Sequence, residues 1–511
     1  MSLLNIIPRD YQKAIFNIAK DNHTLVVLPT GLGKTLIALM MSIERQKAHP
    51  GTKNLILAPT RPLVEQHFEY FKKNLPELFA DIQLFTGSVP APQRKKIWRT
   101  ADIIFSTPQC IANDLENNLY ELKDTSLLVI DEAHRCLKNY DYTKVVKFYK
   151  KQSLFPRILG LTASPGSDSD KVKQICNHLA IEEIELRTRD SPDVKPYIQE
   201  REFDKVEVPF PAEFVQLRVL LKTIFDSKTN QLKAMNLLFG PANKITLLKL
   251  QTRLAMQVSS SRNVQAMIGM SITAQAIKIS HALELLETQT LSGLRDYLNS
   301  LIKQADEKKS RGVQTLVKMP QFISASTYLN ELIAKKIEHP KIQELATIIE
   351  SEFAQKKDAK IIVFSQFRET AQTISNKLNK IHDVKSSIFI GQAKKSNVGM
   401  SQKEQKETIE QFKEGKLNVI CATSIGEEGL DIPEVSAVIF YEPIPSAIRK
   451  IQRGGRTARL APGKMIILVT KDTRDEIHHY AANARERKMY KTIEQIKYDL
   501  KNKPKTLQDF K

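Results

Sequence analysis

The stretch "LVVLPTGLGKTLIALM" (residues 25–40) joins an apolar run to a helix-forming run through a short loop that contains two glycines and a lysine. Such a strand–loop–helix unit can place the backbone N–H groups of a helix N-terminus around a phosphate, and the glycines permit its close approach. Lys34 would reach the β- and γ-phosphates, and the Thr35 hydroxyl would bind Mg²⁺. Leu28 stands where such loops normally carry glycine, yet the flanking runs still predict a nucleotide site.

Short apolar runs of the same kind recur in two series along the chain. Continuous Val, Ile and Leu runs that alternate with amphipathic helices are typical of a parallel sheet covered on both faces. The first series includes "NLILAP", "IQLFTG", "DIIFSTP", "LLVIDEAH" and "RILGLTAS", and the second includes "KIIVFSQF", "SSIFIG", "LNVICAT", "AVIFYE" and "KMIILVT". The sequence therefore predicts an α/β fold with two parallel-sheet domains.

The segment between the two series lacks strand-like runs and carries apolar residues at helical spacing, such as Leu247, Leu250 and Leu254. It is too long and too apolar to be an unstructured linker. We therefore expect a helical domain inserted between the two sheets. The expected organisation is a first domain at residues 1–210, a helical insertion at 211–338, a second domain at 339–484, and a basic C-terminal helix and tail at 485–511.

Composition narrows the possible functions. The chain has 77 Lys and Arg against 57 Asp and Glu, which gives a formal net charge of +20 and a pI near 9.5. Such an excess attracts polyanions such as nucleic acid or anionic lipid, and it favours a nucleic-acid partner over solubility alone. Four scattered cysteines suggest neither a zinc site nor a disulfide framework. Since the N-terminus resembles no secretion signal and no apolar run approaches the roughly 20 residues of a membrane span, we expect a cytoplasmic protein without a membrane partner.

Two further motifs complete the chemistry that the phosphate loop begins. In "LLVIDEAH" (127–134), Asp131 would hold Mg²⁺ through water, and Glu132 would polarise the attacking water. In "IQRGGRTAR" (451–459), Arg456 and Arg459 could reach across from the second domain and neutralise charge on the transferring phosphoryl group. A cleft shared by two domains would couple ATP hydrolysis to their relative movement.

The motifs together resemble a superfamily 2 helicase. In chain order, "RDYQ" resembles the glutamine motif, "PTGLGKT" motif I, "APTRPL" motif Ia, "FTG" motif Ib, "STPQ" a further DNA-contacting element, "DEAH" motif II, "LTASP" motif III, "VFSQFR" motif IV, "ATSIGEEGLDIP" motif V and "QRGGRTAR" motif VI. Longer stretches such as "SQKEQKETIEQF" and "YEPIPSAIRKIQRGGRTAR" resemble the archaeal Hef helicases, which are relatives of eukaryotic FANCM. This resemblance covers nearly the whole chain and implies two RecA-like domains with the helical insertion between them.

The resemblance also implies roles for single residues. Gln12 would read the adenine, His134 and Gln452 would link the ATP site to the DNA track, and Thr35 and Asp131 would bind Mg²⁺. The implied catalytic group is Lys34, Asp131, Glu132, Gln452, Arg456 and Arg459. The other implied ATP contacts are Gln12, Pro29, Thr30, Gly31, Leu32, Gly33, Thr35, Gly429 and Asp431. The implied nucleic-acid contacts are Thr60, Arg61, Gly87, Thr107, Arg368 and Thr423.

The function implied by the resemblance is an ATP-dependent DNA helicase or translocase that remodels branched DNA. Because contacts to the nucleic-acid backbone carry little sequence information, forks and four-way junctions would be recognised by their shape. The implied processes are DNA repair and fork restart, and the implied location is the nucleoid. One alternative is a double-stranded-RNA-stimulated ATPase of the Dicer or viral-RNA-sensor type, which shares the insertion. A non-catalytic clamp on nucleic acid is a second alternative, but it would be expected to have lost Lys34, Asp131, Glu132 or the motif VI arginines.

The sequence departs from the family pattern in motif VI and near the C-terminus. Gly454 stands where a basic residue is usual and Ala458 where glycine is usual, but neither change removes an arginine finger. The "ERK" at 486–488 resembles part of an XPF-type nuclease core. A metal-dependent nuclease needs several converging carboxylates, and too little chain follows to supply them. We expect no nuclease activity from this chain, and a nuclease partner in trans remains open.

The last residues, "KTLQDFK" (505–511), carry Leu507 and Phe510 at the spacing of a short anchor for the sliding clamp PCNA. Pro504 replaces the usual glutamine, and Lys511 replaces the second aromatic residue. The alternative is an unstructured basic tail.

Overall fold

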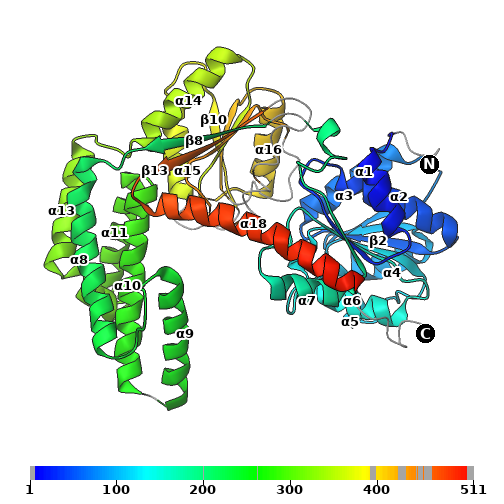
Figure 1. Ribbon diagram of the computed structural model, residues 1–511, viewed down its shortest axis with the longest axis horizontal. Coiled ribbons are helices and arrows are strands. Elements are labelled where there is room, and N and C mark those ends of the chain that lie inside the picture. The colour runs from blue at the N-terminus through cyan, green and yellow to red at the C-terminus, as the bar shows by residue number, and fades with distance from the viewer. Residues whose placement is uncertain are drawn as a thin grey trace.

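The computed structural model describes residues 6–76, 78–198, 201–261, 263–391, 399–423, 433–444 and 463–502, together with Ser446 and Arg453. Two α/β lobes lie side by side, and a bundle of long helices extends from the second lobe (Figure 1). One long helix, α18, runs from the second lobe to the first. Among the described residues, every helix is too short or too polar to cross a membrane.

The first lobe is a seven-stranded parallel sheet in the order β3-β4-β2-β5-β6-β1-β7. Its strands are β1 (Thr24–Val27), β2 (Lys53–Leu57), β3 (Ile82–Phe85), β4 (Ile103–Ser106), β5 (Thr125–Ile130), β6 (Ile158–Thr162) and β7 (Glu183–Leu186). Its helices are α1 (Asp10–Ala19), α2 (Lys34–Ala48), α3 (Arg61–Asn74), α4 (Ala91–Thr100), α5 (Pro108–Glu116), α6 (Asp141–Gln152) and α7 (Ser169–Leu179), and short 3₁₀ turns lie at Ala133–Arg135 and Lys195–Tyr197.

The central strands of this sheet are apolar throughout because helices cover both of their faces. Val27, Leu57 and Ile130 belong to one apolar cluster, while the preceding residues Val26 and Ile56 belong to the cluster on the opposite face. Successive side chains of a strand point to opposite faces, so a strand covered on both sides needs a continuous apolar run. The predicted fold class, an α/β protein with two parallel sheets and a helical bundle between them in sequence, is confirmed.

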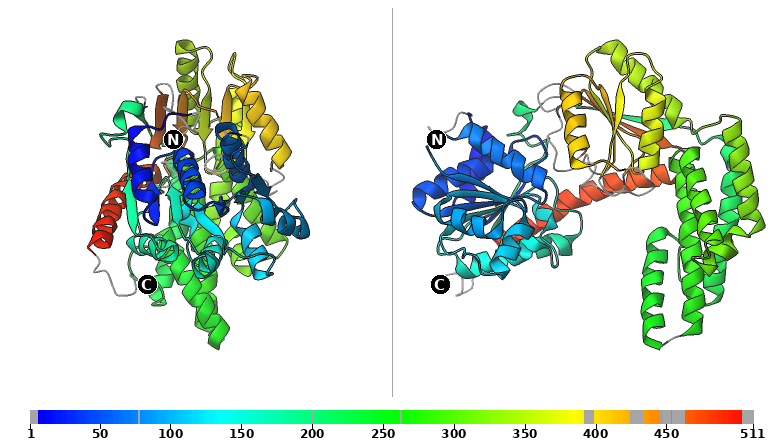
Figure 2. Two further views of the ribbon diagram at one scale, coloured as in Figure 1. Left: turned by 90° about the vertical axis from the view of Figure 1, so that its right-hand side faces the viewer. Right: turned by 180° about the vertical axis from the view of Figure 1, so that it is seen from behind.

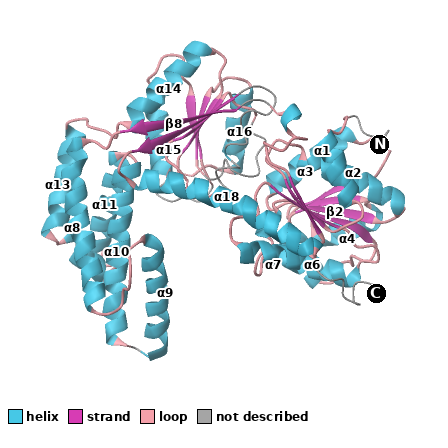
Figure 3. Cartoon of the chain, in the orientation of Figure 1, coloured by secondary structure: helices cyan, strands magenta, loops and turns pink. Residues whose placement is uncertain are grey.

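The second lobe is a six-stranded parallel sheet in the order β10-β11-β9-β12-β13-β8. Its strands are β8 (Arg201–Val208), β9 (Ile361–Phe364), β10 (Ser386–Phe389), β11 (Val419–Ala422), β12 (Ala437–Phe440) and β13 (Gly463–Thr470), and its helices include α14 (Lys341–Gln355), α15 (Arg368–Leu378) and α16 (Gln402–Lys413). Figure 3 shows the strands of both lobes as two separate groups.

Strand β8 lies in the second sheet, although the sequence predicts a first domain that extends to residue 210. It pairs with β13 along its whole length, from Arg201 opposite Gly463 to Val208 opposite Thr470. The strand pattern could not show this, because the partner lies more than 250 residues later in the chain. We therefore place the first domain boundary between β7 and β8.

The insertion is a bundle of helices with its own apolar core. The core includes Phe214, Leu221 and Leu286, all fully buried, and the bundle extends from the second lobe (Figure 1). Its helices are α8 (Ala212–Ala234), α9 (Lys244–Ser261), α10 (Val264–Thr288), α11 (Leu291–Asp306), α12 (Arg311–Val317) and α13 (Pro320–Ala334).

Helix α18 (Arg474–Lys501) begins earlier than predicted and connects the two lobes. The sequence predicts a basic C-terminal helix from residue 485, but the helix begins at Arg474, where the Thr473 side chain caps the Asp475 N–H. Its far end packs Met489 and Ile493 into the apolar core of the first lobe. Seen from behind in Figure 2, it spans the distance between the lobes. The "ERK" at 486–488 lies within this helix.

Candidate nucleotide and nucleic-acid site

The phosphate loop follows β1 and turns into α2 at the carboxyl edge of the first sheet. Gly31 and Gly33 have φ angles of +83° and +76°, in the left-handed region that favours glycine. Gly33 is the N-cap of α2. Within the loop, Lys34 Nζ donates a hydrogen bond to the Leu28 carbonyl oxygen at 3.0 Å. Leu28, at the position where glycine is usual, is fully buried, so its side chain packs in the apolar core.

Two side chains of α1 hold this loop from one side. Tyr11 Oη donates to the Leu32 carbonyl oxygen at 2.8 Å, and Gln12 Nε2 donates to the same oxygen at 3.1 Å. A Cβ atom at Gly33 would lie 2.4 Å from Gln12 Nε2, so a larger residue could not be accommodated without a shift of Gln12. Gln12, predicted to read the adenine, therefore lies directly against the loop.

Asp131 and Glu132 follow β5 at the same edge of the sheet. Asp131 Oδ2 lies 2.8 Å from Nε2 of His67, a residue of α3, and Asp131 Oδ1 accepts the Glu132 N–H at 2.9 Å. Burial alone would raise the pKa of the Asp131 carboxyl, but the His67 hydrogen bond and the positive charge of Lys34 hold that pKa below its ordinary value. Asp131 is therefore ionised, as a Mg²⁺ ligand beside bound phosphates must be.

Glu132 begins a chain of contacts that leads across the first lobe to α18. Its Oε2 lies 3.2 Å from His134 Nδ1, which lies 3.2 Å from the Thr162 hydroxyl. The Thr162 hydroxyl accepts the Ser164 N–H at 3.1 Å, and Ser164 Oγ lies 2.7 Å from Met489 Sδ. Motif II and motif III of the sequence are therefore in contact, and motif III also touches the helix that comes from the second lobe.

The residues of this edge suit a magnesium-bound triphosphate. Asp131 and Thr35 offer oxygen ligands of the kind that Mg²⁺ prefers, and Lys34 offers a cation for phosphate oxygens. The Thr30 hydroxyl is buried and has no hydrogen-bond partner among the described residues, so it is available to a ligand of the loop. When bound, Mg²⁺ would neutralise charge on the β- and γ-phosphates.

The predicted nucleic-acid contacts of the first lobe lie along the other half of the same edge. Thr60, Gly87 and Thr107 follow β2, β3 and β4, which are neighbouring strands at one side of the sheet, while the phosphate loop and Asp131 follow β1 and β5. Because the carboxyl ends of parallel strands share one edge, the predicted nucleotide contacts lie on one half of this edge and the predicted nucleic-acid contacts on the other. The Thr60 hydroxyl is buried and lacks a partner among the described residues.

In the second lobe, the predicted nucleic-acid contacts Arg368 and Thr423 lie near the ends of the neighbouring strands β9 and β11. A salt bridge across the lobes supports their facing arrangement: Lys406 Nζ of α16 lies 3.6 Å from Glu65 of α3. Glu65 also binds Arg61, a predicted nucleic-acid contact, at 2.7 Å. The other predicted site residues of this lobe lie outside the described residues: Gly429, Asp431, Gln452, Arg456 and Arg459.

Sequence reasoning missed His67, the residue that contacts Asp131. A lone histidine on a helix carries no motif signal, and its partner lies 64 residues away in the chain. The one available signal is its position shortly after motif Ia, on the first two turns of the helix that begins at the edge of the site. Met489 was missed for a similar reason, since it reads as one apolar residue in a basic helix.

Comparison with known proteins identifies the family. The model of the DEAD/DEAH box helicases matches residues 9–172, that of the helicase conserved C-terminal domain matches residues 340–461, and one described as "Putative ATP-dependent RNA helicase, helical bundle" matches residues 213–338. The crystal structure of the Pyrococcus furiosus Hef helicase domain is 40% identical with a TM-score of 0.71, covering 93% of this chain and 98% of that one.

Longer proteins match as well. A Methanocaldococcus jannaschii protein named "Putative ATP-dependent RNA helicase" is 38% identical over 96% of this chain, and the Schizosaccharomyces pombe ATP-dependent DNA helicase fml1 is 33% identical over 92% of it. The chain spans 61% and 57% of the length of these two relatives. By its near-complete match to the Pyrococcus structure, the chain belongs to the Hef family of ATP-hydrolysing superfamily 2 helicases.

Proposed function

We propose that this chain is an ATP-driven DNA translocase that remodels branched DNA such as forks and four-way junctions. The observation that carries the proposal is the divided edge of the first sheet. Lys34, Asp131 and Glu132 occupy the half that suits Mg²⁺ and ATP, while Thr60 and Thr107 follow neighbouring strands of the other half. Hydrolysis on one half would then act on a sugar–phosphate backbone held by the other.

The same proposal includes the ATP-site residues of the second lobe that lie outside the described residues. Arg456 and Arg459 would approach the transferring phosphoryl group from the second lobe, with Gln452, Gly429 and Asp431 beside them. The interlobe pair Lys406–Glu65 supports a closed arrangement in which the two lobes face each other.

The alternative function is an ATPase stimulated by double-stranded RNA. One relative is named as an RNA helicase, and that name keeps the alternative open. The Hef-type stretches of the sequence and a relative named as a DNA helicase favour DNA.

ATPase activity measured on single strand, duplex, fork, four-way junction and double-stranded RNA decides between the two. We expect fork and junction DNA to give the largest stimulation. Stimulation by double-stranded RNA that exceeds every DNA would overturn the DNA assignment.

Two partner proposals can be tested separately. The tail at 505–511, outside the described residues, would bind the PCNA clamp; a peptide of the last dozen residues that does not bind at high micromolar concentration would refute this. A nuclease acting in trans would supply any cleavage of the remodelled DNA. Metal-dependent cleavage of a flap by the purified chain would contradict our assignment of no nuclease to this chain.

A further inference from the structure

A buried arginine of the first lobe lies between the two segments that carry the predicted nucleic-acid contacts Gly87 and Thr107. Arg94 belongs to α4, and Asp114 belongs to α5, which begins directly after Thr107. Arg94 Nε donates to Asp114 Oδ2 at 2.7 Å, and Arg94 Nη2 donates to Asp114 Oδ1. Only 9% of Arg94 and 1% of Asp114 are exposed. Two parallel hydrogen bonds of this kind fix the relative orientation of their partners, which one hydrogen bond does not.

The third nitrogen of the guanidinium binds the loop that follows β3. Arg94 Nη1 donates to the Val89 carbonyl oxygen. The Val89 N–H donates in turn to the Thr86 carbonyl oxygen at 3.0 Å, which closes residues 86–89 into a turn. Within this turn, the hydroxyl oxygens of Thr86 and Ser88 lie 2.6 Å apart. Arg94 therefore connects the 86–89 turn to α5 through one side chain.

Two aromatic side chains complete this anchor. Trp98 lies four residues after Arg94 on α4, so the two side chains share one face of the helix. The Trp98 ring stacks on Tyr120, with ring centroids 4.0 Å apart and 6° between the ring planes. Tyr120 Oη donates to Asp114 Oδ2 at 2.8 Å. The Asp114 carboxylate therefore accepts hydrogen bonds from both Arg94 and Tyr120, and packed neighbours fix its position.

The tip of the 86–89 turn is open to a ligand. Gly87 and Ser88 are exposed, and neither backbone N–H donates a hydrogen bond to a described residue. A Cβ atom added at Gly87 would have no other atom within 4 Å, and the φ angle of Gly87 is not positive. Neither packing nor backbone conformation therefore requires glycine at this position. A bare backbone with two available N–H donors suits the close approach of a phosphate oxygen.

The N-terminus of α5 lies beside this turn. Ser106 Oγ donates to the Phe85 carbonyl oxygen at 3.0 Å, so the ends of β3 and β4 are joined directly before the turn and the helix begin. Thr107 is the N-cap of α5, and its hydroxyl does not cap the helix. The N–H groups of a helix N-terminus are also suited to a phosphate.

We propose that Arg94 and Asp114 are positioning residues for the nucleic-acid backbone. They hold the 86–89 turn against α5, so that the turn and the helix N-terminus can bind two phosphates of one strand. Because both side chains are buried, they act through the backbone of the turn and of the helix without touching the nucleic acid. The proposal rests on the proposed function, since it takes Gly87 and Thr107 to contact DNA.

The double variant Arg94→Met/Asp114→Leu removes the pair without leaving a buried charge unpaired. We expect the fork concentration that gives half-maximal ATPase activity to rise about tenfold, with kcat at saturating fork and KM for ATP within about twofold of wild type. Glu116→Gln is the matched control, because it removes an exposed pair with Lys144 from the same helix, α5. All three constants should stay within about twofold in this control. Thermal melting shows whether each variant is folded at the assay temperature.

Arg94→Lys keeps a positive charge opposite Asp114 and serves if the double variant does not fold. An ammonium group lacks the planar fork of the guanidinium, so it cannot hold Asp114 at two points and also bind the Val89 carbonyl in the same geometry. We expect the half-saturating fork concentration to rise in this variant too, by about threefold to tenfold.

The salt dependence of fork binding separates positioning from direct contact. An arginine that acts through neutral N–H groups displaces no counterion, so the slope of log affinity against log salt concentration should be the same in wild type and in both Arg94 variants. A slope smaller by about one in the variants would show that Arg94 itself contacts a phosphate, and would overturn the positioning role.

Gly87→Ala tests whether Arg94 acts through the turn. The added methyl group has room in the fold but would obstruct a phosphate, so we expect fork binding to weaken about fivefold. Combined with Arg94→Lys, the loss should be smaller than the product of the two separate losses, because both changes act on one contact. Unchanged binding in Gly87→Ala, or a fully multiplicative loss in the combination, would contradict the proposal.

The remaining outcomes distinguish this proposal from the proposed function. A wild-type chain whose ATPase is not stimulated by any DNA would overturn the proposed function, and the positioning role with it. A stimulated wild type with unchanged fork saturation in the Arg94 variants, or with equal losses in kcat, in KM for ATP and in fork saturation, would overturn the positioning role alone. A selective rise in the half-saturating fork concentration would support it.

Discussion

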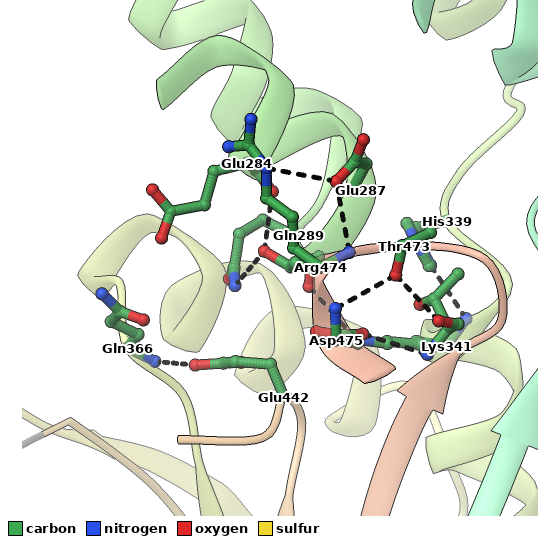
Figure 4. Close-up of polar contacts among 12 residues, drawn as sticks. Glu284, Glu287, Gln289, His339, Lys341, Gln366, Glu442, Thr473, Arg474 and Asp475 are labelled. Carbon is green, nitrogen blue, oxygen red and sulfur yellow. Dashed lines mark hydrogen bonds and ion pairs between the residues drawn. The ribbon is translucent and has the colours of Figure 1, made fainter. Parts of the chain in front are cut away.

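The carboxyl edge of the first sheet can be compared with the joint of the second lobe, where Lys341 pairs with Asp475 and Arg474 pairs with Glu287 (Figure 4). Both regions lie where parallel strands end, but their charged side chains differ in exposure to solvent. At the first edge, Lys34 and Thr35 are partly exposed and Asp131 is bound by a single histidine. At the joint, Lys341 and Asp475 are fully buried against each other. The same sheet architecture therefore serves a site that must admit a charged ligand and a joint that must exclude water.

The difference also concerns which parts of the chain meet. The phosphate loop is one continuous stretch, and its lysine binds a carbonyl only six residues away. The joint brings together α10, α14, the end of β12 and the start of α18, with 134 residues between Lys341 and Asp475 and 187 between Glu287 and Arg474. Local sequence can specify the first region, whereas the second exists only in the folded chain.

The sharpest test of the first region is Glu132→Gln. We expect ATP hydrolysis to fall by about 10³-fold because the amide cannot accept a proton from the attacking water, while nucleotide binding stays nearly unchanged. Steady-state ATPase assays and titration with a fluorescent nucleotide measure the two effects. Glu121→Gln, at an exposed position before β5 and so at the opposite edge of the sheet, is the control. Persistent hydrolysis in Glu132→Gln would show that another group activates the water.

The corresponding test of the joint removes one partner of its buried pair. Lys341→Met should lower the free energy of unfolding by about 3–5 kcal/mol, because it leaves Asp475 buried without its cation. The double variant Lys341→Met/Asp475→Leu should recover most of this loss, since an apolar pair needs no compensation. Thermal and urea unfolding followed by circular dichroism would measure both.

The exposed pair Lys309–Glu307 is the control for the joint. Lys309→Met should leave unfolding unchanged because solvent screens that pair. A loss in Lys309→Met as large as that in Lys341→Met would remove the contrast between buried and exposed charge on which the comparison depends.

A smaller effect is expected at His67, which the first region uses to hold Asp131. His67→Ala should weaken binding of Mg²⁺-nucleotide by about tenfold, in the range found when an outer partner of a metal ligand is removed. His67→Gln, which retains an N–H donor, should recover part of the affinity. Titrations with Mg²⁺ and with EDTA distinguish the cause, because the difference between the variants should vanish in EDTA. If the difference in nucleotide affinity persists in EDTA, His67 acts on the phosphate loop and not on the metal.

The last effect expected is a change in the slope of stability against pH. Burial raises the pKa of Glu442 from its ordinary 4.5 to about 8, so the folded chain binds this proton more tightly than the unfolded chain. Its contribution is complete below about pH 4.5 and is lost as pH rises to about 8. Unfolding curves of Glu442→Gln should therefore show a shallower decline over that range than the wild type. Parallel curves would show that Glu442 is ionised throughout.

Much of the fold and half of the candidate site could be predicted because they are local. The apolar runs specified the strands, and the loop between Leu28 and Thr35 lies where the motif predicted. The residues of motifs II and III converge because they follow β5 and β6, which are neighbouring strands of one parallel sheet. The roles of single residues at that edge remain predictions.

The sequence alone determined that this chain has two parallel sheets, a helical insertion and a phosphate loop, because each follows from side-chain periodicity or from a short continuous motif. Only the tertiary structure decided that β8 joins the second sheet, that His67 holds Asp131, and that Met489 reaches Ser164 from 325 residues away. These contacts depend on how distant segments close on one another. Periodicity reports which face of an element is buried, but it does not report the partner that buries it.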